Sequence, residues 1–118
     1  MIFVLLFLLF VKHWYIDFVN QTIEEVTSKG KYGEWVGIQH SVKHGVATGI
    51  ILLFFSDPFL AMTIGLFEIL THYHIDWYKS NYGCSDLREK EFWTDLGLDQ
   101  LVHYITYLII AYIVLVLF

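Results

Sequence analysis

The chain has 118 residues, a net charge of −5 and a mean hydropathy of +0.57, and 57% of its residues are apolar. This length is that of one domain, and the hydropathy is too high for an ordinary soluble globular protein. The basic residues form no long run, so nucleic-acid binding has no support. A single cysteine, Cys84, excludes both an intramolecular disulfide and a thiolate metal site. We therefore expect an integral membrane protein.

Four apolar stretches predict an all-α fold, an integral membrane four-helix antiparallel bundle that forms a single domain over residues 1–118. The first helix is expected at about residues 1–19. It is interpreted as retained rather than cleaved, because no basic segment precedes it and no small-residue cleavage motif follows. The second helix, at about 36–55, ends in the short turn Ser56-Asp57-Pro58, which starts the third helix at about 58–79. A polar segment with a helical turn near residues 87–93 then leads to the fourth helix, at about 95–118.

An alternating bundle has two unlike ends. The polar end contains residues 21–34 and 80–94, and the apolar end contains the turn at 56–58 and both termini. All 7 lysine and arginine residues lie at or near the polar end. The positive-inside rule therefore predicts that the polar end is cytoplasmic and the termini lie outside, in a bacterial inner membrane.

Histidine and aspartate recur in pairs, and the two members of each pair are four residues apart. This spacing places both side chains on one helical face, with Cβ atoms about 6 Å apart, which is how two side chains of one helix bind one metal ion. One pair falls near the polar end of each predicted helix, so all four pairs are expected at one level. The pairs are His13/Asp17, His40/His44, His72/Asp76 and Asp99/His103.

Five imidazoles and three carboxylates at one level suit one or two divalent metal ions. Zinc is the first choice, with manganese or iron as alternatives. A single His-x-x-x-Asp pair would be weak evidence for a metal site and would favour an interfacial hydrogen-bonded pair instead. Four pairs at one level favour a shared site, because ionisable groups near hydrocarbon are costly and usually functional.

Further polar residues extend these helical faces. Glu68, one turn before His72, is a candidate general base or a partner that orients a ligand. Lys79 is a candidate phosphate-binding group, although a lysine there can also extend to the membrane interface. Gln21 and Asp95 are candidates for orienting ligands, Gln100 is expected to face a neighbouring helix, and His74 points away from the pairs.

These motifs resemble a small membrane family from bacteria and their phages that is catalogued as a domain of unknown function. The resemblance rests on His13/Asp17/Gln21, His40/His44, His72/Asp76/Lys79 and Asp99/Gln100/His103, and it covers most of the chain. The pattern is also similar to membrane-bound metal-dependent hydrolases. The resemblance implies a metal site on the paired residues and a hydrolytic reaction.

The leading hypothesis is a membrane-embedded metal-dependent hydrolase with its site at the cytoplasmic leaflet. Its expected substrate is a phospholipid or a lipid-linked phosphoester, with Glu68 or a free aspartate as the base and Lys79 on the phosphate. One alternative is a haem or di-iron redox protein, although the di-iron desaturase motif His-x-x-His-His is missing. The other is a non-enzymatic metal-binding membrane protein or phage effector. Membrane lipids are the expected surroundings in every case.

Overall fold

The computed structural model describes all 118 residues, and the chain is all helical, without a strand. Four long helical segments carry the fold, and the first and last of them each end in a short π-helix. The elements are α1 (Ile2–Trp14), η1 (Tyr15–Asn20), α2 (Ile23–Ser28), α3 (Trp35–Leu52), α4 (Pro58–Tyr82), α5 (Lys90–Tyr112) and η2 (Ile113–Leu117).

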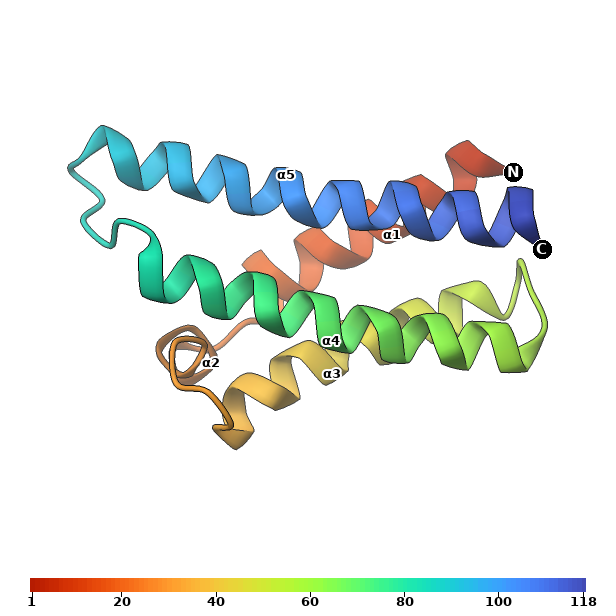
Figure 1. Cartoon of the computed structure of the whole chain (residues 1–118), viewed down its shortest axis with the longest axis horizontal. Helices are drawn as coiled ribbons and strands as arrows, with labels where there is room; N and C mark the ends of the chain where they lie inside the picture. The colour runs from red at the N-terminus through yellow and green to blue at the C-terminus, as the bar shows by residue number, and fades with distance from the viewer.

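The long helices alternate in direction, so both termini lie at the end that also holds the turn between α3 and α4 (Figure 1). Helix α1 packs against α3 and α5, and α4 packs against the same two helices from the other side. The arrangement measures 43 Å along its longest axis. The antiparallel order of the four helices, and the separation of a polar end from an apolar end, are as predicted.

Local sequence signals account for the helix starts. Asp57 accepts hydrogen bonds from the backbone N–H groups of Phe59 and Leu60, and Pro58 occupies the first turn of α4, where its missing N–H has no consequence. A reciprocal capping box between Thr22 and Glu25 starts α2. Helix α2 was not predicted, although Thr-x-x-Glu is its sequence signature.

Some boundaries differ from the prediction. The fourth helix begins at Lys90 rather than near residue 95, so the turn expected at 87–93 is mostly its first turn. Helix α4 continues to Tyr82, beyond the predicted end at 79, and α3 stops at Leu52, before the predicted end at 55. Helices α4 and α5 continue past the apolar stretches because an exposed helical turn tolerates polar side chains, so hydropathy marks the apolar boundary rather than the helix end.

The interior changes character along the bundle. Toward the apolar end it is a hydrophobic core that contains Leu5, Leu9 and Leu52, each fully buried. Helices α3 and α4 approach closely where Gly45 faces Gly65, and a Cβ added at Gly45 would lie 2.4 Å from the Gly65 carbonyl oxygen. Toward the polar end the interior is built from polar side chains.

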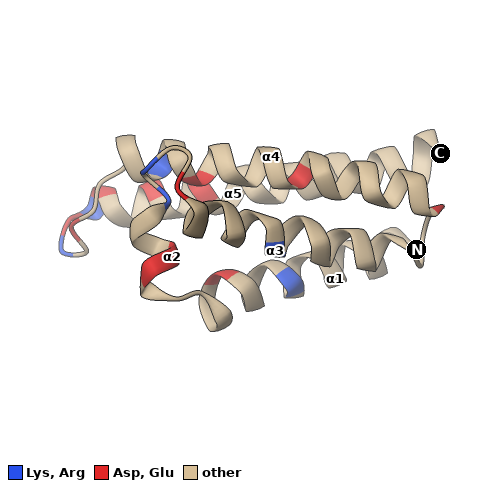
Figure 2. Cartoon of the chain, turned by 90° about the horizontal axis from the view of Figure 1, so that it is seen from below, with Lys and Arg blue, Asp and Glu red and all other residues tan.

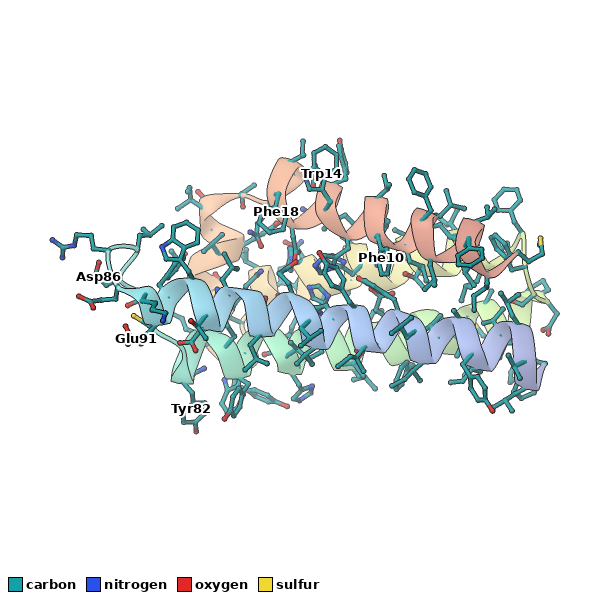
Figure 3. The ribbon with its side chains drawn as sticks, turned by 90° about the horizontal axis from the view of Figure 1, so that it is seen from above. Phe10, Trp14, Phe18, Tyr82, Asp86 and Glu91 are labelled. Atoms are coloured by element: carbon teal, nitrogen blue, oxygen red, sulfur yellow. The ribbon has the colours of Figure 1, made fainter.

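The outer surface carries many exposed apolar side chains, including Phe3 (83% exposed), Phe59 (74%) and Phe7 (65%). Trp14 projects outward from α1, whereas Tyr82, Asp86 and Glu91 lie at the polar end (Figure 3). Charged residues gather toward the polar end, and Asp57 is the charged residue at the apolar end (Figure 2). Two segments, Ile2–Asn20 and Lys90–Leu117, are long and apolar enough to cross a membrane.

Candidate metal centre

The structure brings all eight predicted ligand residues together in the interior. Each pair comes from one of the four long segments, and none of the eight side chains belongs to a residue more than 8% exposed. The residues are His13, Asp17, His40, His44, His72, Asp76, Asp99 and His103. Buried polar residues therefore occupy this level of the interior, and buried apolar residues occupy the level next to it, toward the apolar end.

One group of four side chains surrounds the carboxylate of Asp17. Its Oδ1 atom lies 2.8 Å from His44 Nε2, 3.0 Å from His40 Nε2 and 3.8 Å from His72 Nε2. Asp17 lies in the π-helix η1, and such widened turns are frequent at functional sites. One ligand atom from each of these four residues lies within 4.8 Å of the others, a spacing that one metal ion can draw together.

A second group joins α4 and α5. His103 Nε2 lies 3.1 Å from Asp76 Oδ1 and 3.6 Å from Asp99 Oδ1. His72 connects the two groups, because its Nε2 atom is 3.2 Å from Asp76 Oδ2 and also faces Asp17. His13 completes a third set with His72 and His103. The donors thus form one continuous cluster.

Two of the imidazoles, those of His13 and His40, are oriented by partners on their outer side, whereas His72 Nδ1 is buried without one. His40 Nδ1 lies 3.2 Å from Glu25 Oε2, so its Nε2 faces the cluster. His13 Nδ1 contacts the Tyr107 hydroxyl at 2.8 Å. Metal-ligating histidines typically have one nitrogen on the metal and the other held by such a group. This orientation fits a metal centre.

Below the cluster, toward the apolar end, lies a buried polar triad of Lys12, Glu68 and Tyr107. The Lys12 ammonium is 2.5 Å from Glu68 Oε1 and 3.1 Å from the Tyr107 hydroxyl, which in turn donates to Glu68 at 3.0 Å. Lys12 Nζ also lies 3.4 Å from His44 Nδ1. Glu68 therefore reaches His44 through Lys12, and its predicted role as a base or as an orienting partner stays a prediction.

At the polar end, residues from the 21–34 segment close over the cluster. Lys29 Nζ lies 3.0 Å from Asp76 Oδ2, and Glu25 pairs with both His40 and Lys43. Burial favours the neutral form of Lys29, but the charges of Asp76 and Asp17 outweigh it and raise the pKa of Lys29. Burial likewise opposes ionisation of Glu25, yet hydrogen bonds from Lys43 and His40 lower its pKa. Both groups therefore keep their charges.

The remaining predicted residues occupy different places. Gln100 does face a neighbouring helix, because its Oε1 atom lies 2.9 Å from His13 Nε2. Gln21 donates to the backbone carbonyl of Asp17 rather than to its carboxylate. Asp95 accepts from the backbone N–H of Cys84 and so stabilises the loop before α5, not a ligand. His74 is exposed and contacts Tyr32, away from the cluster.

Lys79 lies outside the cluster, in a cleft of about 500 Å³ between residues 74–83 of α4 and residues 95–102 of α5. Asp99 also lines this cleft. Its Oδ1 atom is buried without a hydrogen-bond partner, although it faces His103. The cleft therefore connects the surface at Lys79 with one edge of the cluster.

Four contributors to the site were missed from the sequence: Lys12, Glu25, Lys29 and Tyr107. Tyr107 follows His103 by four residues, so its place on the same helical face was a usable signal. Lys12 interrupts an apolar stretch next to His13, which was a second signal. Nothing local distinguishes the buried Lys29 from the exposed Lys31.

These features define an all-helical protein with a buried cluster of imidazoles and carboxylates, open to the surface on one side. The chain belongs to the family described as "Protein of unknown function (DUF3307)", whose model matches residues 5–118. The predicted membership of a family of unknown function is thereby confirmed. Neither the curated proteins nor the solved structures give a match.

Proposed function

We propose that this protein is a membrane-embedded, metal-dependent hydrolase whose centre lies at the depth of the cytoplasmic headgroups. The observation that carries the proposal is the convergence of five imidazoles and three carboxylates from four helices on one buried level. A polar cluster with a purely structural role would not require so many imidazoles and carboxylates on one level. Nor would it require partners that hold the outer nitrogen atoms of His13 and His40.

The balance of buried charge supports a bound cation. Five buried carboxylates, those of Asp17, Glu25, Glu68, Asp76 and Asp99, are paired with three ammonium groups, those of the buried Lys12, the largely buried Lys29 and the half-buried Lys43. With neutral imidazoles this leaves an excess of two negative charges, and uncompensated buried charge is strongly unfavourable. One divalent ion would neutralise it, and two would leave a positive site for an anionic substrate.

Nitrogen and oxygen donors together suit zinc, with manganese or iron as alternatives. The residues that would hold the ion are Asp17, His40, His44 and His72 in the first group, and Asp76, Asp99 and His103 in the second, with His13 between them. A metal in such a site lowers the pKa of a bound water and polarises the oxygen of the scissile bond.

A membrane location is supported by the distribution of side chains. Apolar side chains cover the outside of the helices while polar ones fill the inside of the polar half. The 43 Å length compares with about 40–45 Å for a bilayer including its headgroups. In our proposal all four long helices cross the membrane, with the polar end in the cytoplasm and the termini outside.

The protein's own residues have distinct roles in this proposal. Asp99 is the better candidate for the base, because it lines the cleft and its Oδ1 atom has no hydrogen-bond partner; with Asp99 in this role, Asp76 and His103 are the ligands of the second group. Lys79 binds the phosphate of the substrate from the same cleft. Glu68 acts as a positioning residue, since its ion pair with Lys12 holds it behind His44 rather than in the cleft.

Redox chemistry at iron is the second candidate, because histidines and carboxylates that project inward from four helices also build di-iron centres. Haem is less compatible with the packing. The His44 and His72 rings stack with centroids 3.6 Å apart, and His103 follows 4.2 Å from His72, which leaves no gap for a macrocycle between them.

Elemental analysis of the purified protein tests the centre. We expect one or two divalent ions per chain, lost in His40→Ala/His44→Ala and retained in His74→Ala, a control that removes an exposed histidine outside the cluster. Metal-free wild-type protein, or equal metal content in the two variants, would contradict the proposal.

Hydrolysis is tested separately on the metal-loaded protein, with release of inorganic phosphate from alkyl phosphates as the measurement. We expect turnover that Asp99→Asn abolishes and Asp86→Asn, in the loop before α5 and outside the cleft, retains. One redox-active iron centre without any phosphate release would instead establish the second candidate.

A further inference from the structure

The cleft between α4 and α5 has features that the metal centre alone does not explain. We propose that this α4–α5 cleft binds a phosphate monoester carried on a single long alkyl chain. The phosphate lies beside Lys79, and the chain lies along Ile75, Leu98 and Val102. The inference rests on the proposed function and names the substrate class of that same site.

The lining of the cleft has polar residues at its outer end, whereas its inner part combines the aliphatic side chains with His74 and Asp99. Lys79 follows Ile75 by one turn of α4, and Asp95 precedes Leu98 by about one turn of α5. Because the two helices are antiparallel, both polar residues lie toward the polar end and the aliphatic ones toward the apolar end (Figure 1). A single-chain lipid in a membrane has the same order of headgroup and chain.

Lys79 is the one cationic residue of the cleft, which also contains Asp95, whose carboxylate accepts from the Cys84 backbone N–H, and Asp99. Lys79 takes part in no ion pair within the chain, and its ammonium lies 5.9 Å from the centre of the Phe92 ring. Asp99, with its unpartnered Oδ1 atom, belongs both to the cleft and to the second group of donors. In our proposal the phosphate held by Lys79 shares the cleft with Asp99, which is also one edge of the cluster.

The rim and the volume fit an amphiphile rather than a free phosphate ion. Tyr78 and Tyr82 at the rim are 63% and 68% exposed, and tyrosine is enriched at membrane interfaces. The cleft volume of about 500 Å³ falls within the range of roughly 300–1,000 Å³ that is usual for small-molecule sites. Inorganic phosphate would leave the aliphatic part of the lining without a partner.

Photo-crosslinking tests the location of the chain without requiring turnover. The probe is a dodecylphosphonate with a diazirine close to the phosphonate, about four carbons along its chain, mixed into phosphatidylcholine nanodiscs that contain the protein. Its carbon–phosphorus bond resists hydrolysis. We expect label on peptides from residues 74–83 or 95–102, and an excess of inorganic phosphate should compete poorly.

Matched tryptophan variants of α5 supply the control. Leu98 and Leu101 are similarly exposed, at 57% and 53%, but only Leu98 lines the cleft. Leu98→Trp should fill the apolar part and reduce labelling about tenfold, because several buried methylene contacts are lost. Leu101→Trp should label like the wild type. Equal labelling of the two variants, or label confined to other peptides, would overturn the proposal.

A second pair of variants examines the phosphate end. Lys79→Ala should weaken labelling about tenfold, Lys79→Arg should restore most of it, and the exposed Lys90→Ala should leave it unchanged. Full labelling in Lys79→Ala would contradict the position of the phosphate.

The proposed cleft and the proposed hydrolytic reaction can each be rejected without rejecting the other. Selective loss of label in Leu98→Trp from a protein without hydrolase activity would support the cleft and reject the reaction. Efficient hydrolysis of dodecyl phosphate by Leu98→Trp, at the wild-type rate, would support the reaction and reject the cleft.

Discussion

The two halves of the bundle interior are equally buried, but one consists of apolar side chains and the other of polar side chains. Toward the apolar end Leu5, Leu9 and Leu52 are fully buried, and toward the polar end His40 and His44 are buried to the same degree. Apolar packing stabilises the first half directly. The second half must offset the desolvation of every polar group with a partner. Stability and chemistry are therefore separated along the helix axis. A substitution in the apolar half should lower the free energy of unfolding and leave the chemistry of the polar half unchanged.

The largest effect is expected from breaking the buried ion pair at the boundary between the halves. Lys12→Met leaves Glu68, only 1% exposed, with an uncompensated charge. The free energy of unfolding should fall by about 3–5 kcal/mol, measured by denaturant or thermal unfolding in detergent. Lys12→Met/Glu68→Gln should recover much of the loss. A double variant less stable than Lys12→Met would contradict this account of the boundary.

A smaller loss of stability, with no loss of chemistry, is expected from the apolar half. Leu9→Ala creates a cavity in the hydrophobic core and should lower the free energy of unfolding by about 2–4 kcal/mol. Leu8→Ala, at an outward position 36% exposed, is the matched control and should cost less. Metal content per folded chain should be unchanged in both. A loss of metal in Leu9→Ala would show that the two halves are not separable.

The smallest effect concerns the pH dependence of the polar half. Burial opposes the charge of Glu25, but hydrogen bonds from Lys43 and His40 outweigh it and lower the pKa of Glu25 in the folded chain. Its contribution to stability is therefore complete above the unfolded pKa of about 4.3 and is lost as the pH falls through the lower, folded pKa. Glu25→Gln should make stability less dependent on pH below about 5. Thermal midpoints between acidic and neutral pH measure it, with the exposed Glu24→Gln as the control; identical slopes in the two variants would contradict the assignment.

The residues predictable from the sequence are those whose geometry is local. Four-residue spacing fixes a helical face, and alternating apolar stretches fix which helix ends share a level. These two patterns are sufficient to place His13/Asp17 and His72/Asp76 together. The metal, the substrate and the membrane topology stay predictions.

What the sequence did not reveal depends on how the polar segments fold back. Glu25 reaches His40 only because α2 turns over the end of α3, and Lys29 reaches Asp76 from the loop that follows. Lys12 was counted among the basic residues at the polar end, yet the structure buries it against Glu68. Such contacts join residues far apart in sequence, for which periodicity carries no information.

The distribution of the candidate ligands over the chain also bears on how the fold assembles. Asp17 lies in η1, directly after α1, whereas Asp99 and His103 lie on α5. The cluster is therefore complete only when α1 and α5 have both docked. Until α5 docks, Asp76 lacks its contact with His103, so the polar half of the interior is satisfied only as a whole.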